Sequence, residues 1–193
     1  DLGYETYQRI LKEAVMELKN EEFADTLTAS DGTSGEEEFV ADCAVESDME
    51  LLLPPDYVPQ EGERISLYKE LDGIERELDL QRFRMHLEDR FGKIPKVTAE
   101  LLRVPRLRYL ARRLGIEKIV LKQEQMYMYF VDDNNKAYYQ SPMFGRILNY
   151  LQAHPRRCRI REKNGRRSLA IADVPTVEEA VALLQEILSL NSI

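Results

Sequence analysis

The spacing of apolar and polar residues divides the chain into a helical first part and a mixed second part. Apolar residues recur every three or four positions, which predicts amphipathic helices, over 3–20, 64–77, 79–92 and 98–115. From Ile116 the period shortens to two, which predicts strands over 116–121 and 126–130. A helix over 141–153, strands over 157–162 and 167–172, and a final helix from Thr176 to about Leu188 complete the pattern.

Several residues mark where these elements begin and end. The expected N-caps, with side-chain oxygens that can accept from the first turn, are Asp79, Ser141 and Thr176. Pro105 interrupts the fourth helix, so we expect two short helices with Pro105 near the start of the second. Asn164-Gly165 lies between the last two strands and is a strong signal for a two-residue hairpin turn.

The order of elements predicts an α+β fold. A helical N-terminal half precedes a ββαββα arrangement, which resembles two copies of one unit. A four-stranded antiparallel sheet with its helices on one face would bury these apolar positions. Edge-strand pieces are also plausible over 39–45 and 49–53. The helix over 3–20 is expected to be detached, because a polar, acidic and glycine-containing segment follows it. It would pack either on another domain of a longer protein or on this body.

Charge separates the chain into two parts of opposite sign. Residues 1–61 carry 3 Lys and Arg against 17 Asp and Glu, a net charge of -14, whereas residues 62–193 carry 24 against 18, a net charge of +6. We therefore divide the chain into an N-terminal helix within 1–24, an acidic linker and extended segment over 25–61, and a basic body over 62–193. The two parts could attract one another or face different partners.

The composition argues against several classes of function. No apolar run approaches the roughly 20 residues that cross a bilayer, and we expect a protein that is not secreted. Cys43 and Cys158 form no CxxC pair and are expected to be reduced thiols in a cytoplasmic protein. His86 and His154 lack metal-ligand spacing, and no nucleotide-binding or nucleophile motif is present. We expect a non-enzymatic binding or regulatory module with no cofactor or metal site.

Two groups of charged residues are candidate contact sites. At 100° per residue, one flank of the helix over 79–92 carries Arg82, His86, Asp89 and Arg90. This flank is either a docking face or an ordinary solvated side. The second group, which could contact nucleic acid, consists of Arg108, Arg112, Arg159 and Arg161.

Five short motifs, in this order, resemble the C-terminal end of the bacterial transcription-repair coupling factor family, also called Mfd. They are Gly3-Tyr4-Glu5-x-Tyr7-x-x-x-Leu11-x-x-Ala14, Leu53-Pro54-Pro55-Asp56-Tyr57-Val58-Pro59, Arg64-x-x-Leu67-Tyr68, Asp89-Arg90-Phe91-Gly92-x-x-Pro95 and Leu114-Gly115-Ile116-x-Lys118-Ile119. The resemblance covers nearly the whole chain, and the absence of an initial Met agrees with a piece of a longer protein.

The resemblance implies a function for the parent protein. Members of the family are ATP-dependent translocases on double-stranded DNA that remove stalled RNA polymerase and recruit nucleotide excision repair. Their ATP and Mg²⁺ site lies on a motor upstream of this chain. Residues 1–24 would be the tail of the motor's RecG-like coupling motif. Residues 62–193 would be the regulatory C-terminal domain, which docks on the parent's UvrB-like N-terminal module, masks UvrA binding and restrains the motor.

The resemblance also assigns a role to the charged flank. The family's docking helix ends in the Asp-Arg-Phe-Gly motif, which matches Asp89-Arg90-Phe91-Gly92. Asp89 and Arg90 are therefore the expected docking contacts, with Arg82 and His86 beside them. The family often has an acidic residue at the position of His86. An accessory domain that contacts nucleic acid or RNA polymerase through the four arginines is the alternative.

Overall fold

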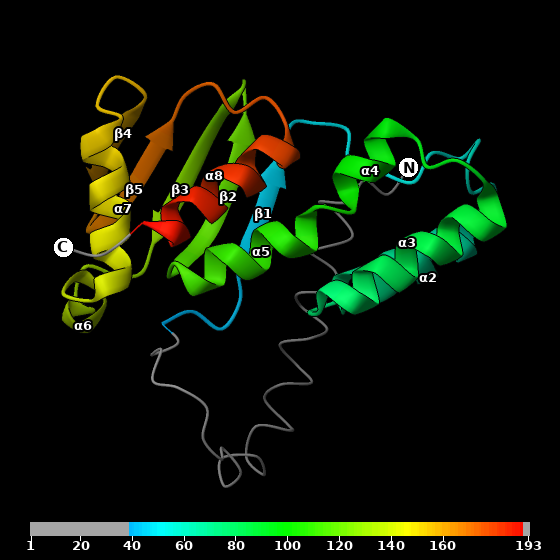
Figure 1. Ribbon diagram of the computed structural model, residues 1–193, viewed down its shortest axis with the longest axis horizontal. Helices are drawn as coiled ribbons and strands as arrows, with labels where there is room; N and C mark the ends of the chain where they lie inside the picture. Colours follow the sequence, from blue (N-terminus) through cyan, green and yellow to red (C-terminus); the bar gives the residue numbers. More distant parts are fainter. Residues whose placement is uncertain (1–38, 191–193) are drawn as a thin grey trace, which may run out of the picture.

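A five-stranded sheet forms the centre of the structure, which is a computed structural model describing residues 39–190. The strands are β1 (Ala44–Ser47), β2 (Ile116–Lys122), β3 (Gln125–Phe130), β4 (Cys158–Lys163) and β5 (Arg166–Ile171), in the spatial order β1-β2-β3-β5-β4 (Figure 1). The predicted helix over 3–20, the segment 1–24 and residues 25–38 of the predicted linker lie outside the described residues.

The two antiparallel hairpins form near the predicted positions. In β2 and β3 alternate residues are buried, and the pairs Ile119–Met128 and Leu121–Met126 face the same side. Asn164 and Gly165 both have positive φ, 55° and 72°, as a type I′ turn requires, so the predicted hairpin turn is confirmed.

The sheet differs from the expected four-stranded antiparallel one because β1 joins it in parallel with β2. A parallel neighbour needs a crossover, and the helices between residues 61 and 113 supply it. Residues 39–61 were expected to form a linker and extended segment, but in the structure they pack into the main core. Their buried apolar side chains are Val40, Cys43, Val45, Leu51, Leu53 and Val58.

Three helices cover one face of the sheet: α5 (Val104–Arg113), α7 (Pro142–Ala153) and α8 (Val177–Ser189) (Figure 1). Two of the predicted N-caps are confirmed, since Ser141 accepts from the Phe144 N–H at 3.3 Å and Thr176 from the Glu179 N–H at 3.1 Å. Pro105 lies in the first turn of α5, separate from the short α4 (Lys96–Leu101), as the sequence predicted. The mixed α+β class is therefore confirmed.

The remaining helices show where the sequence pattern was wrong. α2 (Glu61–Asp72) ends earlier than predicted, at Gly73, and α3 (Glu77–Phe91) begins with Arg76 as its N-cap. Asp79 is not the cap but lies in the first turn, where its carboxylate faces the positive end of the helix dipole. A short α6 (Lys136–Tyr139) precedes α7, so the order of elements after Ile116 is not a simple doubled ββα unit.

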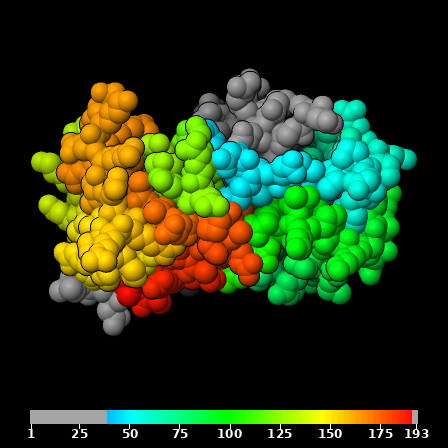
Figure 2. Space-filling view, turned by 90° about the horizontal axis from the view of Figure 1, so that it is seen from above, coloured from blue at the N-terminus to red at the C-terminus, as the bar shows by residue number. Residues whose placement is uncertain are grey.

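The α2–α3 pair forms one end of an elongated molecule, and α7 with the β4–β5 hairpin forms the other (Figures 1 and 2). None of the helices within residues 39–190 combines the length and apolar character needed to cross a lipid bilayer.

Candidate docking surfaces

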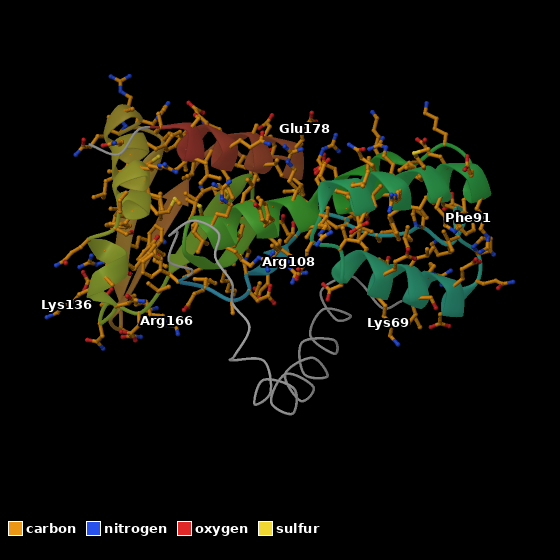
Figure 3. The ribbon with its side chains drawn as sticks, turned by 60° about the horizontal axis from the view of Figure 1, so that its bottom comes forward. Lys69, Phe91, Arg108, Lys136, Arg166 and Glu178 are labelled. Carbon is orange, nitrogen blue, oxygen red and sulfur yellow. The ribbon has the colours of Figure 1, made fainter. Side chains whose placement is uncertain are left out.

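Helix α3 is held against the body by a narrow apolar stripe. Phe83 and Leu87 are buried, and Phe91 packs against Tyr57 with 5.7 Å between ring centroids. The Tyr57 hydroxyl donates to the Gly92 carbonyl at 2.9 Å. Gly92 ends the helix with φ of 87°, and its N–H donates to the Glu88 carbonyl. The helix is thus fixed at its C-terminal end, and Figure 3 shows Phe91 at the far end of the molecule.

The opposite side of α3 points directly away from the core. At 100° per residue Leu78 lies half a turn from the buried Leu87. We call this side the outer face of α3, and its residues are Leu78, Arg82, Met85, His86 and Asp89. Leu78 is 57% exposed and Met85 is 63% exposed, although both are large and apolar. An exposed apolar pair ringed by charged side chains is the composition of a protein contact surface.

The structure brings together three of the four residues predicted for docking. Arg82, His86 and Asp89 are exposed on the outer face, and Arg82 is 3.9 Å from Asp79 on the same helix. Arg90 lies to one side of them, where it forms an ion pair with Glu63 of α2 and stacks over the Phe91 ring at 5.1 Å. Arg90 therefore helps to hold α3 on α2.

Sequence reasoning missed Leu78 and Met85 as surface residues. The predicted helices over 64–77 and 79–92 leave Leu78 between them, so the sequence pattern does not place it on the same face as Met85. With the true helix start at Glu77, the same angular argument places Leu78 on the same side as Met85. The signal was present in the sequence, but it depended on the helix boundary.

The four arginines of the alternative site fall into two groups. Arg108 is only 16% exposed and bridges Asp42 and Asp72, at 2.8 and 2.6 Å. It lies in the middle of the molecule, near the junction of the sheet with the α2–α3 pair (Figure 3). Arg112 is 21% exposed and lies 4.0 Å from Glu75. Arg159 and Arg161 instead lie exposed on β4.

A groove of about 790 Å³ runs between the α2–α3 turn, α5 and α8. Its lining is partly basic and partly apolar, and it includes Arg76, Arg106, Arg112, Tyr109 and Leu80. Arg106 lies 3.8 Å from Glu77, so part of its charge is neutralised within the protein. The groove adjoins the N-terminal end of α3.

The cysteine thiols and the His154 ring, which are reactive groups in other proteins, pack against neighbouring residues in this structure. Cys43 and Cys158 are buried thiols, and burial raises the pKa of Cys158 although the Arg157 charge opposes the shift. His154 Nδ1 lies 3.0 Å from the Tyr150 carbonyl, and its ring stacks on Tyr150. Within residues 39–190 there is no group of three or more His, Cys, Asp or Glu side chains that could hold a metal ion.

Comparisons with known proteins support the resemblance over most of the chain. Residues 47–141 match the TRCF domain family. The chain is 30% identical over 159 residues to the transcription-repair-coupling factor of Escherichia coli, which is 82% of this chain and 12% of that protein. It is 24% identical over 137 residues to the factor of Helicobacter pylori, which is 71% of this chain and 12% of that protein. The chain thus spans about 12% of the length of these relatives.

A solved structure shows the same fold. It is described as the C-terminal domain of transcription-repair coupling factor and superposes with a TM-score of 0.59 at 19% identity. The match covers 76% of this chain and 92% of that one. The sequence matches place this chain in the transcription-repair coupling factor family, with a TRCF domain over residues 47–141, and the solved structure shares its fold.

Proposed function

We propose that this chain is the non-catalytic, regulatory C-terminal domain of an ATP-dependent DNA translocase that couples transcription to DNA repair. The outer face of α3 docks on the parent's UvrB-like N-terminal module, masks its UvrA-binding surface and restrains the motor. The chain itself uses no cofactor, because ATP and Mg²⁺ belong to the motor. DNA, UvrA and RNA polymerase are partners of the parent protein.

The single observation that carries this proposal is the exposed apolar pair on the outer face of α3. Leu78 and Met85 are 57% and 63% exposed, and Arg82 and Asp89 lie between and beside them. Such residues gain hydrophobic stabilisation only when a partner covers them. The family match supplies the context, since residues 47–141 contain the whole of α3.

The free energy of docking through the outer face of α3 is small enough for a reversible contact. Covering a half-exposed Leu or Met contributes on the order of 1 kcal/mol, and exposed ion pairs contribute about 0 to 1 kcal/mol each. A contact built from two apolar and three polar side chains then totals a few kcal/mol. Shifting a two-state equilibrium from 1:99 to 99:1 needs about 5.5 kcal/mol of differential binding energy. A partner that binds only the undocked parent with that energy would therefore release the contact.

The experiment that tests the proposal is UvrA binding to the full-length parent with and without Asp89→Arg, at fixed salt. Work in the parent is needed because a tethered domain has a high effective concentration, which mixed fragments lack. The matched control is Glu70→Arg, the same charge change at an exposed position of α2. We expect Asp89→Arg to raise UvrA binding and Glu70→Arg to leave it unchanged. Equal effects of the two variants, or no effect of Asp89→Arg in a folded protein, contradict the proposal.

The alternative function is contact with RNA polymerase or nucleic acid through Arg108, Arg112, Arg159 and Arg161. The exposure of Arg159 and Arg161 favours it for those two residues. In the parent, Arg159→Glu with Arg161→Glu would then weaken polymerase association and leave UvrA binding as it is.

A further inference from the structure

The sheet has a second face on which no helix of residues 39–190 packs, opposite α5, α7 and α8 (Figure 1). Because successive side chains in a strand point to opposite sides, the neighbours of the buried Met126, Met128 and Leu169 lie on this open face. The residues at its centre are Tyr127, Tyr129, Ser168, Ala170, Arg159 and Arg161.

The strand register arranges these six residues in two parallel rows. Tyr129 pairs with Ser168, which pairs with Arg161, and Tyr127 pairs with Ala170, which pairs with Arg159. Each row therefore runs from a tyrosine over a small residue to an arginine. With strands about 4.8 Å apart, tyrosine and arginine backbones are separated by about 10 Å, and the side chains between them are short.

Tyr127 and Tyr129, the tyrosines of the two rows, each contact a neighbouring side chain. Tyr127 donates its hydroxyl to the Gln125 Oε1 at 2.8 Å. Lys118 Nζ, which pairs with Glu46 at 3.1 Å, lies 5.8 Å from the Tyr129 ring centroid. Both tyrosines are only partly buried, so part of each residue is accessible to a ligand.

Positive charge on the open face exceeds the negative charge that could neutralise it. Glu46 pairs with Lys118, and Glu117 pairs with Arg166 at 3.5 Å. Arg159 and Arg161 are exposed and form no ion pair with another described residue. Their guanidinium groups can therefore bind an anion without breaking a contact within the described part of the chain.

We propose that this open face binds single-stranded nucleic acid, with phosphates on Arg159 and Arg161 and bases stacked on Tyr127 and Tyr129. Two stacking rings on one strand, about 6.8 Å apart, beside a row of cations is the arrangement by which open sheets take unpaired bases. A duplex does not expose base faces, and an acidic peptide would meet the arginines but leave the tyrosines without stacking partners. The contacts involve phosphates and base faces only, so RNA and DNA should bind alike. This inference does not depend on docking through α3.

The test is fluorescence anisotropy of labelled oligo-dT and oligo-rU of about 15 nucleotides, a length that covers one such site. The whole 193-residue chain is titrated at low salt and near physiological salt. We expect both oligonucleotides to bind, within about threefold of each other, and log K to fall with log salt by roughly 0.7 for each phosphate contact. Tyr127→Ala with Tyr129→Ala should weaken binding at least about fivefold at either salt concentration.

The charge variant and its control separate a built site from general attraction. Arg159→Glu with Arg161→Glu should weaken binding by about tenfold or more and reduce the salt slope by roughly 1.4, from the loss of two phosphate contacts. Arg84→Glu with Lys93→Glu makes the same charge change at exposed positions on and after α3, and should reduce binding much less. Circular dichroism confirms that each variant is folded.

Four outcomes would overturn the inference. The first is no anisotropy change with either oligonucleotide. The second is an equal loss of binding in the control pair and the arginine pair, which indicates diffuse electrostatics. The third is unchanged binding in the folded tyrosine variant. The fourth is tighter binding of an acidic peptide of similar charge, which would make the face a peptide site. Asp89→Arg should not change oligonucleotide binding. A negative result in this experiment therefore leaves the proposal of docking through α3 unaffected, and the reverse also holds.

Discussion

The ring of Tyr138 lies directly against Gly115, where a Cβ would stand 2.1 Å from its Cε2 atom. The Tyr138 hydroxyl donates to the carbonyl of Leu114, the residue before this glycine, at 2.7 Å. Burial raises the pKa of Tyr138 well above its usual 10, so the hydroxyl stays protonated and remains a donor. This contact joins α6 to the turn between α5 and β2, and Gly115 has φ of 76° at that turn.

We predict that Gly115→Ala destabilises the chain by about 2 to 4 kcal/mol, through both the clash with Tyr138 and the strain of a positive φ. Urea unfolding followed by circular dichroism measures it. Gly165→Ala, with φ of 72° and no atom within 4 Å, isolates the strain and should cost about 1 kcal/mol. Gly62→Ala, in α2 and in open space, should be neutral or stabilising by up to about 1 kcal/mol. Equal losses for Gly115→Ala and Gly165→Ala would show that Tyr138 moves aside freely.

The sequence could not reveal the contact between Gly115 and Tyr138, because α6 shows no periodic pattern. Its four residues follow Asp132-Asp133-Asn134-Asn135, which predicts only a turn. The hairpins and the capped helices were predictable, since Asn164-Gly165, Ser141 and Thr176 each act through local backbone chemistry. An edge-strand piece was expected over 39–45, and β1 overlaps its end. The parallel pairing of β1 with β2 could not be predicted, because a long crossover sets it.

Arg108 connects three segments of the fold through two ion pairs. It joins α5 to Asp42, which precedes β1, and to Asp72 at the end of α2. We predict that Arg108→Met destabilises the chain by about 2 to 4 kcal/mol at neutral pH, because it removes the guanidinium group that two partly buried carboxylates share. Arg84→Met, at an exposed position on α3, is the control and should change the free energy of unfolding by less than about 0.5 kcal/mol. If Arg108→Met lowers the free energy of unfolding by less than about 0.5 kcal/mol, neighbouring Lys and Arg side chains take over the charge of Arg108.

The same cluster predicts a pH dependence. Burial would raise the pKa of Asp42, but the Arg108 charge and hydrogen bonds from Arg108 and Cys43 outweigh it and hold the pKa below its ordinary 3.8. A depressed folded-state pKa stabilises the fold above about 3.8 and loses that contribution as pH falls through the lower folded value. Asp42→Asn should therefore be less stable than wild type at pH 7, and the difference should shrink below about pH 4. A difference in unfolding free energy that stays constant with pH would contradict this assignment.

Tyr68 holds the segment before α2 in place, because its hydroxyl accepts from the buried Leu53 N–H at 2.7 Å. We predict that Tyr68→Phe costs about 1 to 3 kcal/mol, the usual cost of an unpaired buried donor. Tyr109→Phe, at a tyrosine that is 44% exposed, should change stability by less than about 0.5 kcal/mol. Amide hydrogen exchange at Leu53 gives an independent readout, since its protection should fall in Tyr68→Phe alone. Unchanged protection would mean that water replaces the hydroxyl.

The candidate docking face was only partly predictable for a related reason. The angular positions of Arg82, His86 and Asp89 follow from the helix period alone, and the structure keeps them together. Whether a charged side chain on that helix is free or paired depends on the neighbouring helix. Arg90 pairs with Glu63 because α2 packs beside α3, and the sequence gives no sign of that approach.

The last prediction separates the apolar part of the docking face from its charges. Leu78→Ser with Met85→Ser should leave the stability of the chain within about 0.5 kcal/mol of wild type for each change, because both side chains are exposed. In the full-length parent the same pair should raise UvrA binding about tenfold or more, since covering the two side chains contributes on the order of 2 kcal/mol to docking. Ile160→Ser is the matched control, because Ile160 is 48% exposed and lies on β4, far from α3 (Figure 1). If Ile160→Ser raises UvrA binding equally, or if the Leu78 and Met85 pair has no effect in a folded parent, the partner does not cover the outer face of α3. If Asp89→Arg raises UvrA binding while the Leu78 and Met85 double variant does not, the docking contact is electrostatic and should weaken as salt rises.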